Sequence, residues 1–83
     1  METKMNSVHS NLEIEGQIAR MGMIPGLLYV AETQTGRVFS MRFGNFFGYR
    51  GQTAKEFGFR PGRRIRFRVN EDRQTVASAT IVK

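Results

Sequence analysis

In the stretch Arg63-Arg64-Ile65-Arg66-Phe67-Arg68-Val69, arginine and apolar residues alternate at each of the last six positions. A period of two is typical of a strand with one face in the core and the other in water. The pattern predicts three inward and three outward side chains: Ile65, Phe67 and Val69 inside, and a cationic ladder of Arg64, Arg66 and Arg68 outside. This stretch therefore favours a β fold.

Glycine-rich turns separate further strand-like segments on both sides of this stretch. With the strand at 63–69, the predicted strands are 13–21, 26–33, 37–43 and 74–82. Gly16 is expected to bend the first strand. Five strands in this order predict an all-β fold, a five-stranded Greek-key OB-type barrel with a long loop between strands 3 and 4.

The predicted loop, residues 44–62, contains five glycines and one proline. Such a length in a compact domain indicates function, disorder or local structure. Residues 53–57 fit a single helical turn that Thr53 caps and Gly58 ends. Phe57 and Phe59 are expected to attach the loop to the barrel.

The chain has 83 residues, of which 40% are apolar, and this size allows one small domain. We expect a flexible N-terminal tail over residues 1–11 and a single domain over 12–83. The longest apolar run, 21–31, is too short to cross a bilayer, and the first residues lack a secretory signal. The sequence therefore predicts a soluble, cytoplasmic protein without a membrane partner.

Charge and composition narrow the function classes. The net charge is +6, and ten of the thirteen cations are arginine, which binds phosphate bidentately and stacks on flat rings. There is no cysteine and only one histidine, His9 in the presumed tail. Because nucleophilic and metal-dependent catalysis need clustered bases or ligands, we expect no enzyme activity, no metal and no cofactor.

Several blocks of the sequence resemble those of a cold-shock domain over residues 13 to 83. They are Gly16-Gln-Ile-Ala-Arg, Gly26-Leu-Leu-Tyr-Val, Val38-Phe-Ser-Met, Pro61-Gly-Arg-Arg-Ile-Arg-Phe-Arg-Val and 77–82. Other OB subtypes, such as initiation-factor-one-like or S1-like barrels, share this general pattern and stay open.

The resemblance implies binding of single-stranded RNA or DNA through aromatic residues on the second and third strands. Leu27 and Tyr29 occupy two of the family's platform positions, and Phe39 a third. Met41 and Arg42 stand where the family has His and Phe, and Arg20 or Met21 stands at its first-strand Trp. These departures imply a smaller stacking surface.

The predicted nucleic-acid site combines cations for phosphates with apolar or aromatic side chains for bases. The cations are Arg20, Arg37, Arg42, Arg50, Arg64 and Arg66, and the base contacts are Leu27, Tyr29, Phe39, Met41, Phe46 and Phe47. Alternation is taken to place Tyr29 and Phe39 on one exposed face. The alternatives are that these rings pack beneath the loop and that the arginine ladder is simply a solvated strand face.

A second function class also fits the sequence. A regulatory barrel could use its basic and apolar face to hold an acidic protein, with Leu27, Met41 and Phe43 as contact residues. The expected oligomeric state is a monomer or a weak homodimer.

Overall fold

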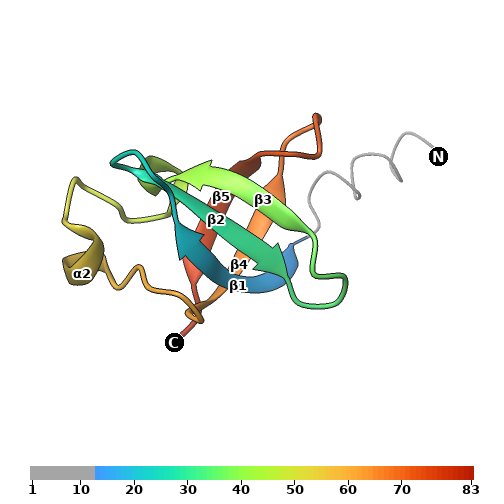
Figure 1. The fold of residues 1–83 in the computed structure, drawn as a ribbon, viewed down its shortest axis with the longest axis horizontal. Coiled ribbons are helices and arrows are strands. Elements are labelled where there is room, and N and C mark those ends of the chain that lie inside the picture. The colour runs from blue at the N-terminus through green and yellow to red at the C-terminus, as the bar shows by residue number, and fades with distance from the viewer. Residues whose placement is uncertain (1–12) are drawn as a thin grey trace.

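The computed structural model describes residues 13–83 (Figure 1). The predicted tail at 1–11 lies outside the described residues. Each of the five observed strands begins and ends within two residues of its predicted bounds. In chain order the elements are β1 (Ile14–Met21), β2 (Leu27–Glu32), β3 (Val38–Arg42), the 3-10 turn η1 (Phe43–Asn45), α2 (Ala54–Phe57), β4 (Arg64–Val69) and β5 (Val76–Ile81).

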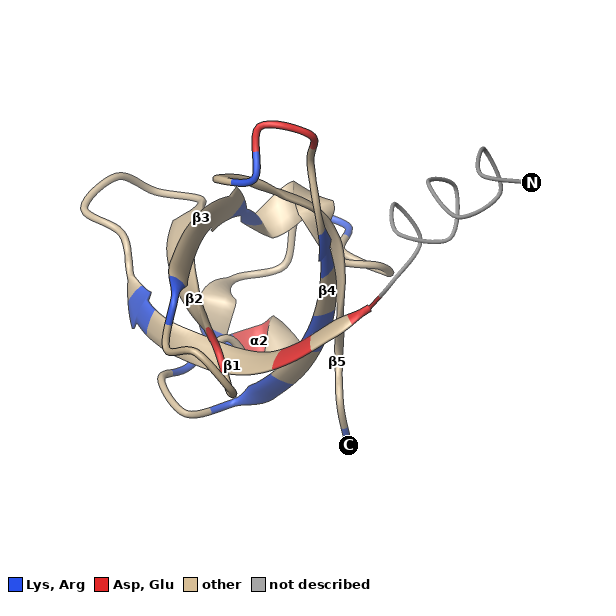
Figure 2. Cartoon of the chain, turned by 90° about the vertical axis from the view of Figure 1, so that its right-hand side faces the viewer, with Lys and Arg blue, Asp and Glu red and all other residues tan. Residues whose placement is uncertain are grey.

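The strands form one sheet in the order β3-β2-β1-β4-β5, and every pair of neighbours is antiparallel. The sheet curls into a half-barrel around its core, as the view along its interior shows (Figure 2). Its two edges approach each other at an isolated parallel bridge between Ser40 and Thr75. The predicted all-β fold of five strands is confirmed.

The bend of the sheet depends on Gly16, where β1 pairs with β2 on one side and with β4 on the other. A Cβ at this position would collide with the carbonyl oxygen of Ala31 and lie 2.8 Å from Cε1 of Phe67. Only glycine allows such a close approach of backbone and ring. A register shift between Ile18 and Arg20 adds a second irregularity to β1.

Inward side chains from all five strands and from the segment between β3 and β4 build the core. Its buried members are Ile18, Leu28, Val30, Phe39, Met41, Phe46, Phe59, Ile65, Phe67, Val76 and Ala79. The inward positions predicted for Ile65 and Phe67 are confirmed, and Val69 packs against this core half-buried.

Val38 on β3 faces outward and is 52% exposed. Its neighbour Phe39 points inward instead, and its ring centroid lies 5.4 Å from that of Phe67. The strand pairing explains this orientation: Phe39 lies opposite the buried Val30, and directly opposed residues share a face.

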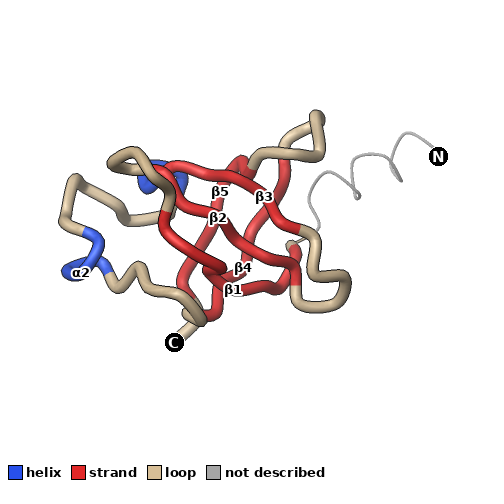
Figure 3. The backbone as a smooth tube through the Cα atoms, viewed as in Figure 1, coloured by secondary structure: helices blue, strands red, loops and turns tan. Residues whose placement is uncertain are grey.

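The segment between β3 and β4 contains η1 and α2 (Figure 3). As predicted, Thr53 caps α2: its Oγ1 accepts a hydrogen bond from the Glu56 amide at 3.1 Å, and Gly58 ends the helix at φ 96°. The Phe57 and Phe59 rings lie 4.7 Å apart and pack on the core, which confirms their predicted role. None of the helices in the described part is long and apolar enough to cross a membrane.

Candidate functional site

The outward surface of β1, β2 and β3 collects residues that the strand pairing places side by side. Tyr29 on β2 lies between Arg20 on β1 and Ser40 on β3, and Leu27 lies opposite Arg42. We call this surface the β1–β3 face and define it by eight positions: Gln17, Arg20, Leu27, Tyr29, Ala31, Val38, Ser40 and Arg42. None of these eight residues is Asp or Glu.

Arg20 and Tyr29 form a stacked pair at the centre of this face. The guanidinium carbon of Arg20 lies 4.1 Å from the centroid of the Tyr29 ring. This cation–π contact holds a flat cation at the surface, where its N–H groups can still bind phosphate and its outer plane can stack on a base. Arg20 is exposed and Tyr29 is half-buried, so the pair is accessible from outside.

Apolar side chains and a second cation surround this pair. Leu27 is half-buried, Val38 is exposed, and the Arg42 side chain is exposed at the end of β3. The Arg42 amide donates to Oδ1 of Asn45 at 2.9 Å, which fixes the backbone where β3 ends. Cations, one ring and aliphatic groups thus occupy one continuous surface.

Three residues of the predicted site lie in the core and not on this face. Phe39, Met41 and Phe46 are each 3% exposed, so the prediction that they contact bases is wrong. Alternation within each strand was correct, but Tyr29 lies opposite Ser40 and not opposite Phe39 or Met41. A one-residue difference in register exchanges the two faces of a strand.

Phe46 is buried for a different reason. It forms an isolated bridge with Ala79 of β5, and its ring lies 4.7 Å from that of Phe59. The neighbouring Phe47 is 81% exposed, but its amide donates to the Ala79 carbonyl, so Phe47 lies against β5 and not on the β1–β3 face.

The remaining predicted cations separate into different surroundings. Arg37 is exposed, its guanidinium carbon lies 5.0 Å from the centroid of the Phe39 ring, and its Nη2 donates to the Arg73 carbonyl. It therefore joins the turn before β3 to the turn before β5. Arg50 is exposed in the segment between η1 and α2.

Two arginines of the β4 ladder are balanced by acidic residues on β1 and just before it, whose positions are red beside the blue ones of β4 in Figure 2. Nε of Arg66 lies 3.9 Å from Oε2 of Glu15, and Nη2 of Arg68 lies 3.6 Å from Oε2 of Glu13. Among residues 13–83, no other arginine has a carboxylate within 4.0 Å. The alternation of Glu13 and Glu15 around Ile14 was a sequence signal for this balance.

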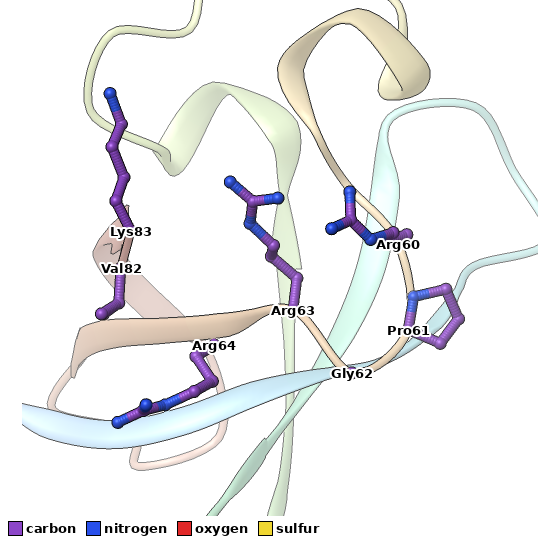
Figure 4. Close-up of a pocket in the computed structure, with 7 residues that line it drawn as sticks. All are labelled: Arg60, Pro61, Gly62, Arg63, Arg64, Val82 and Lys83. Carbon is purple, nitrogen blue, oxygen red and sulfur yellow. The ribbon is translucent and has the colours of Figure 1, made fainter.

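A second cationic region, of which only Arg64 was predicted as a site residue, lies at the start of β4. Arg60, Arg63, Arg64 and Lys83 line a hollow there, together with Pro61, Gly62 and Val82 (Figure 4). The sequence signal for this cationic region was the close spacing of cations around the predicted Pro61-Gly62 turn.

No protein family, curated protein or solved structure matches this chain.

Proposed function

We propose that this chain is an OB-type Greek-key barrel that binds single-stranded RNA or DNA on its β1–β3 face. The strand order supports this fold: β1, β2 and β3 form a meander, β4 pairs with the other side of β1, and β5 approaches β3 at a parallel bridge. The resemblance of residues 13 to 83 to a cold-shock domain supports the same fold and the same class of ligand.

One observation carries the proposal: the β1–β3 face presents the Arg20–Tyr29 stack among apolar side chains with no carboxylate at its eight positions. Phosphates are therefore attracted to these positions, and a base can approach a flat surface. The surface of β1 and β4 has the opposite property, because its arginines are paired with Glu13 and Glu15.

In this mechanism, phosphate contacts contribute more to the binding affinity than base stacking does. Stacking on an aromatic side chain contributes about 1–3 kcal/mol per base, and this face offers one ring, Tyr29, in place of several. Arg20 and Arg42 would bind phosphates, while Leu27 and Val38 would contact bases through their methyl groups. We therefore expect modest affinity and low sequence preference.

Two matched variants test the location of the site. Arg20→Gln removes a cation from the β1–β3 face, and Arg66→Gln removes one from the balanced surface. In a fluorescence titration with a mixed-sequence oligonucleotide at low salt, we expect Arg20→Gln to weaken binding roughly three- to tenfold. Arg66→Gln should change it by less than about twofold, because Glu15 already offsets this charge.

Absence of binding by the unmodified chain at low salt would exclude the proposed function. Equal losses in the two variants would exclude the β1–β3 face as the site, because unspecific charge would then explain the binding. Thermal unfolding of both variants provides the control for folding.

The alternative function, binding of an acidic protein, loses two of its three predicted contact residues. Met41 is buried, and Phe43 is half-buried with its ring 4.4 Å from that of Phe59. Only Leu27 of the three lies on the β1–β3 face. This distribution favours nucleic acid over a protein partner. In a sedimentation experiment we expect a monomer or a weak homodimer.

A further inference from the structure

A hollow of about 430 Å³ opens at the start of β4, and none of its lining residues belongs to the β1–β3 face. We call it the β4 hollow. Its lining residues are Arg60, Pro61, Gly62, Arg63, Arg64, Val82 and Lys83. Four of these seven are cations, and none is Asp or Glu.

Three of the four cations extend to the same side of the strand. Figure 4 shows the guanidinium groups of Arg60 and Arg63 and the amine of Lys83 on one side of the start of β4. The guanidinium of Arg64 extends to the opposite side, where Arg64 also lines a second hollow with Glu15 and Gln17. Arg64 thus follows Arg63 in the sequence, but its side chain extends to the other side of β4.

Backbone hydrogen bonds hold this arrangement. The amide of Gly62 donates to the Ile18 carbonyl at 2.8 Å, and the Ile18 amide donates to the Arg63 carbonyl at 2.9 Å, so the turn is fixed on β1. The Arg63 amide closes the turn on the Arg60 carbonyl at 3.1 Å. Gly62 adopts φ 87°, a conformation that favours glycine.

Among the residues that the structure describes, the cations of the hollow have no anionic partner. Within residues 13–83, the side chains of Arg60, Arg63 and Lys83 make no ion pair and no hydrogen bond. Nε of Arg63 is buried and lacks a hydrogen-bond partner. Because the Nη groups of Arg63 also have no partner among residues 13–83, this guanidinium can bind an oxyanion.

We propose that the β4 hollow binds a phosphorylated group with two or more negative charges, a diphosphate or a terminal phosphomonoester. Three cations on one side of β4 exceed what one phosphodiester charge needs, and a planar guanidinium binds two oxygens of one phosphate. This site goes beyond the proposed function, because none of its lining residues is among the eight positions of the β1–β3 face.

Inorganic pyrophosphate is the probe for the site, with the full chain and NMR detection of the arginine Nε–H groups at low salt. We expect a saturable shift of the Arg63 Nε–H signal. Arg63→Gln should weaken pyrophosphate binding about tenfold or more, because it removes charged hydrogen bonds, and Arg60→Gln should weaken it severalfold.

Arg50→Gln is the matched control, since it removes the same charge from an exposed arginine that does not line the hollow. It should change pyrophosphate affinity by less than about twofold. An equal loss in Arg50→Gln and Arg63→Gln, or a shift that does not saturate, would overturn the proposal. Amide spectra establish that each variant is folded. A second substitution at the same position, Arg63→Lys, retains the charge but should not restore bidentate binding of the phosphate.

Two further ligands identify the source of the phosphate. Tighter binding of a 5′-phosphorylated oligonucleotide than of its 5′-hydroxyl counterpart, lost in Arg63→Gln, assigns the hollow to a strand end. If the chain binds a nucleoside diphosphate and binds the two oligonucleotides with equal affinity, the hollow is assigned to a free nucleotide. Pyrophosphate has no base, so its binding should persist in Tyr29→Ala, and this separates failure of the hollow from failure of the β1–β3 face.

Discussion

Gly16 is the first residue of β1 that pairs with β2 as well as with β4. Its missing side chain leaves room for the Ala31 carbonyl and for the edge of the Phe67 ring. Since Phe67 is a fully buried core residue, a local change at Gly16 acts directly on the centre of the domain.

We expect Gly16→Ala to lower the free energy of unfolding by about 1–3 kcal/mol, the usual cost of overpacking a core. Urea unfolding measures this loss, which would lower the midpoint temperature of a domain of this size by about 4–8 °C per kcal/mol. Gly44→Ala is the control, because a Cβ on Gly44 would meet nothing within 4 Å. Equal stability of the two variants would contradict the close packing at Gly16.

Asp72 organises the turn between β4 and β5. Its Oδ1 accepts from the amides of Gln74 at 2.9 Å and of Thr75 at 3.1 Å, and these hydrogen bonds lower the pKa of the Asp72 carboxyl below its ordinary value of 3.8. A carboxylate stabilised in this way contributes to stability above the unfolded pKa and loses that contribution as pH falls through the lower folded pKa.

The stability difference between the unmodified chain and Asp72→Asn should therefore be constant at neutral pH and shrink as pH falls below about 3.8. Asparagine keeps an acceptor oxygen but does not titrate, so the variant isolates the charge. Urea unfolding at a series of pH values measures the difference. A difference that stays unchanged down to strongly acidic pH would show that the charge of Asp72 does not contribute.

At the scale of elements, alternate residues of β3 belong to the core and to the β1–β3 face. Phe39 and Met41 are buried, whereas Val38 and Arg42 are exposed on the β1–β3 face. The pairing of Phe39 with Val30 decides which side each residue takes.

Two substitutions on β3 should therefore differ in their effect on the free energy of unfolding. Phe39→Ala should lower the free energy of unfolding by about 3–5 kcal/mol, because it leaves a cavity beside Phe67. Val38→Thr keeps a β-branched side chain on the surface and should change stability by no more than about 0.5 kcal/mol. A larger loss in Val38→Thr, measured by urea unfolding, would reverse the assignment of the two faces.

Most of the elements could be predicted from local patterns, whereas half of the proposed contact surface could not. Thr53 and Gly58 mark both ends of α2 by their chemistry alone, and Ile65 and Phe67 follow from alternation in β4. Phe39 and Met41 could not be placed this way, because both sides of β3 carry apolar residues. The choice between them depends on the register with β2, a property of two strands and not of one.

At the scale of the whole molecule, the net charge of +6 is unevenly distributed. Glu13 and Glu15 offset the middle of the β4 ladder, while the β1–β3 face and the β4 hollow have no acidic side chain at their defining positions. The molecule therefore has two separate surfaces that can attract anions and one that is balanced.

This distribution predicts the salt dependence of oligonucleotide binding. If Arg20 and Arg42 each neutralise one phosphate, the plot of log affinity against log salt concentration should have a slope of about −1.4 on single strands. Titrations at several salt concentrations measure it. A slope near zero would contradict a phosphate-based mechanism, and a slope far steeper than −3 would mean that cations outside the β1–β3 face also bind the strand.

The sequence by itself determined the strands, the turns, the cap of α2 and the excess of arginine, because each depends on residues close together in the chain. Tertiary structure alone decided the register of β3 on β2, the pairing of Arg66 with Glu15 and the position of Arg60, Arg63 and Lys83 on one side of β4. These depend on contacts between distant segments, and the shift of one residue in a strand exchanges its buried and exposed sides. The physical reason is that alternation specifies two faces, while only packing against a partner specifies which of them is the core.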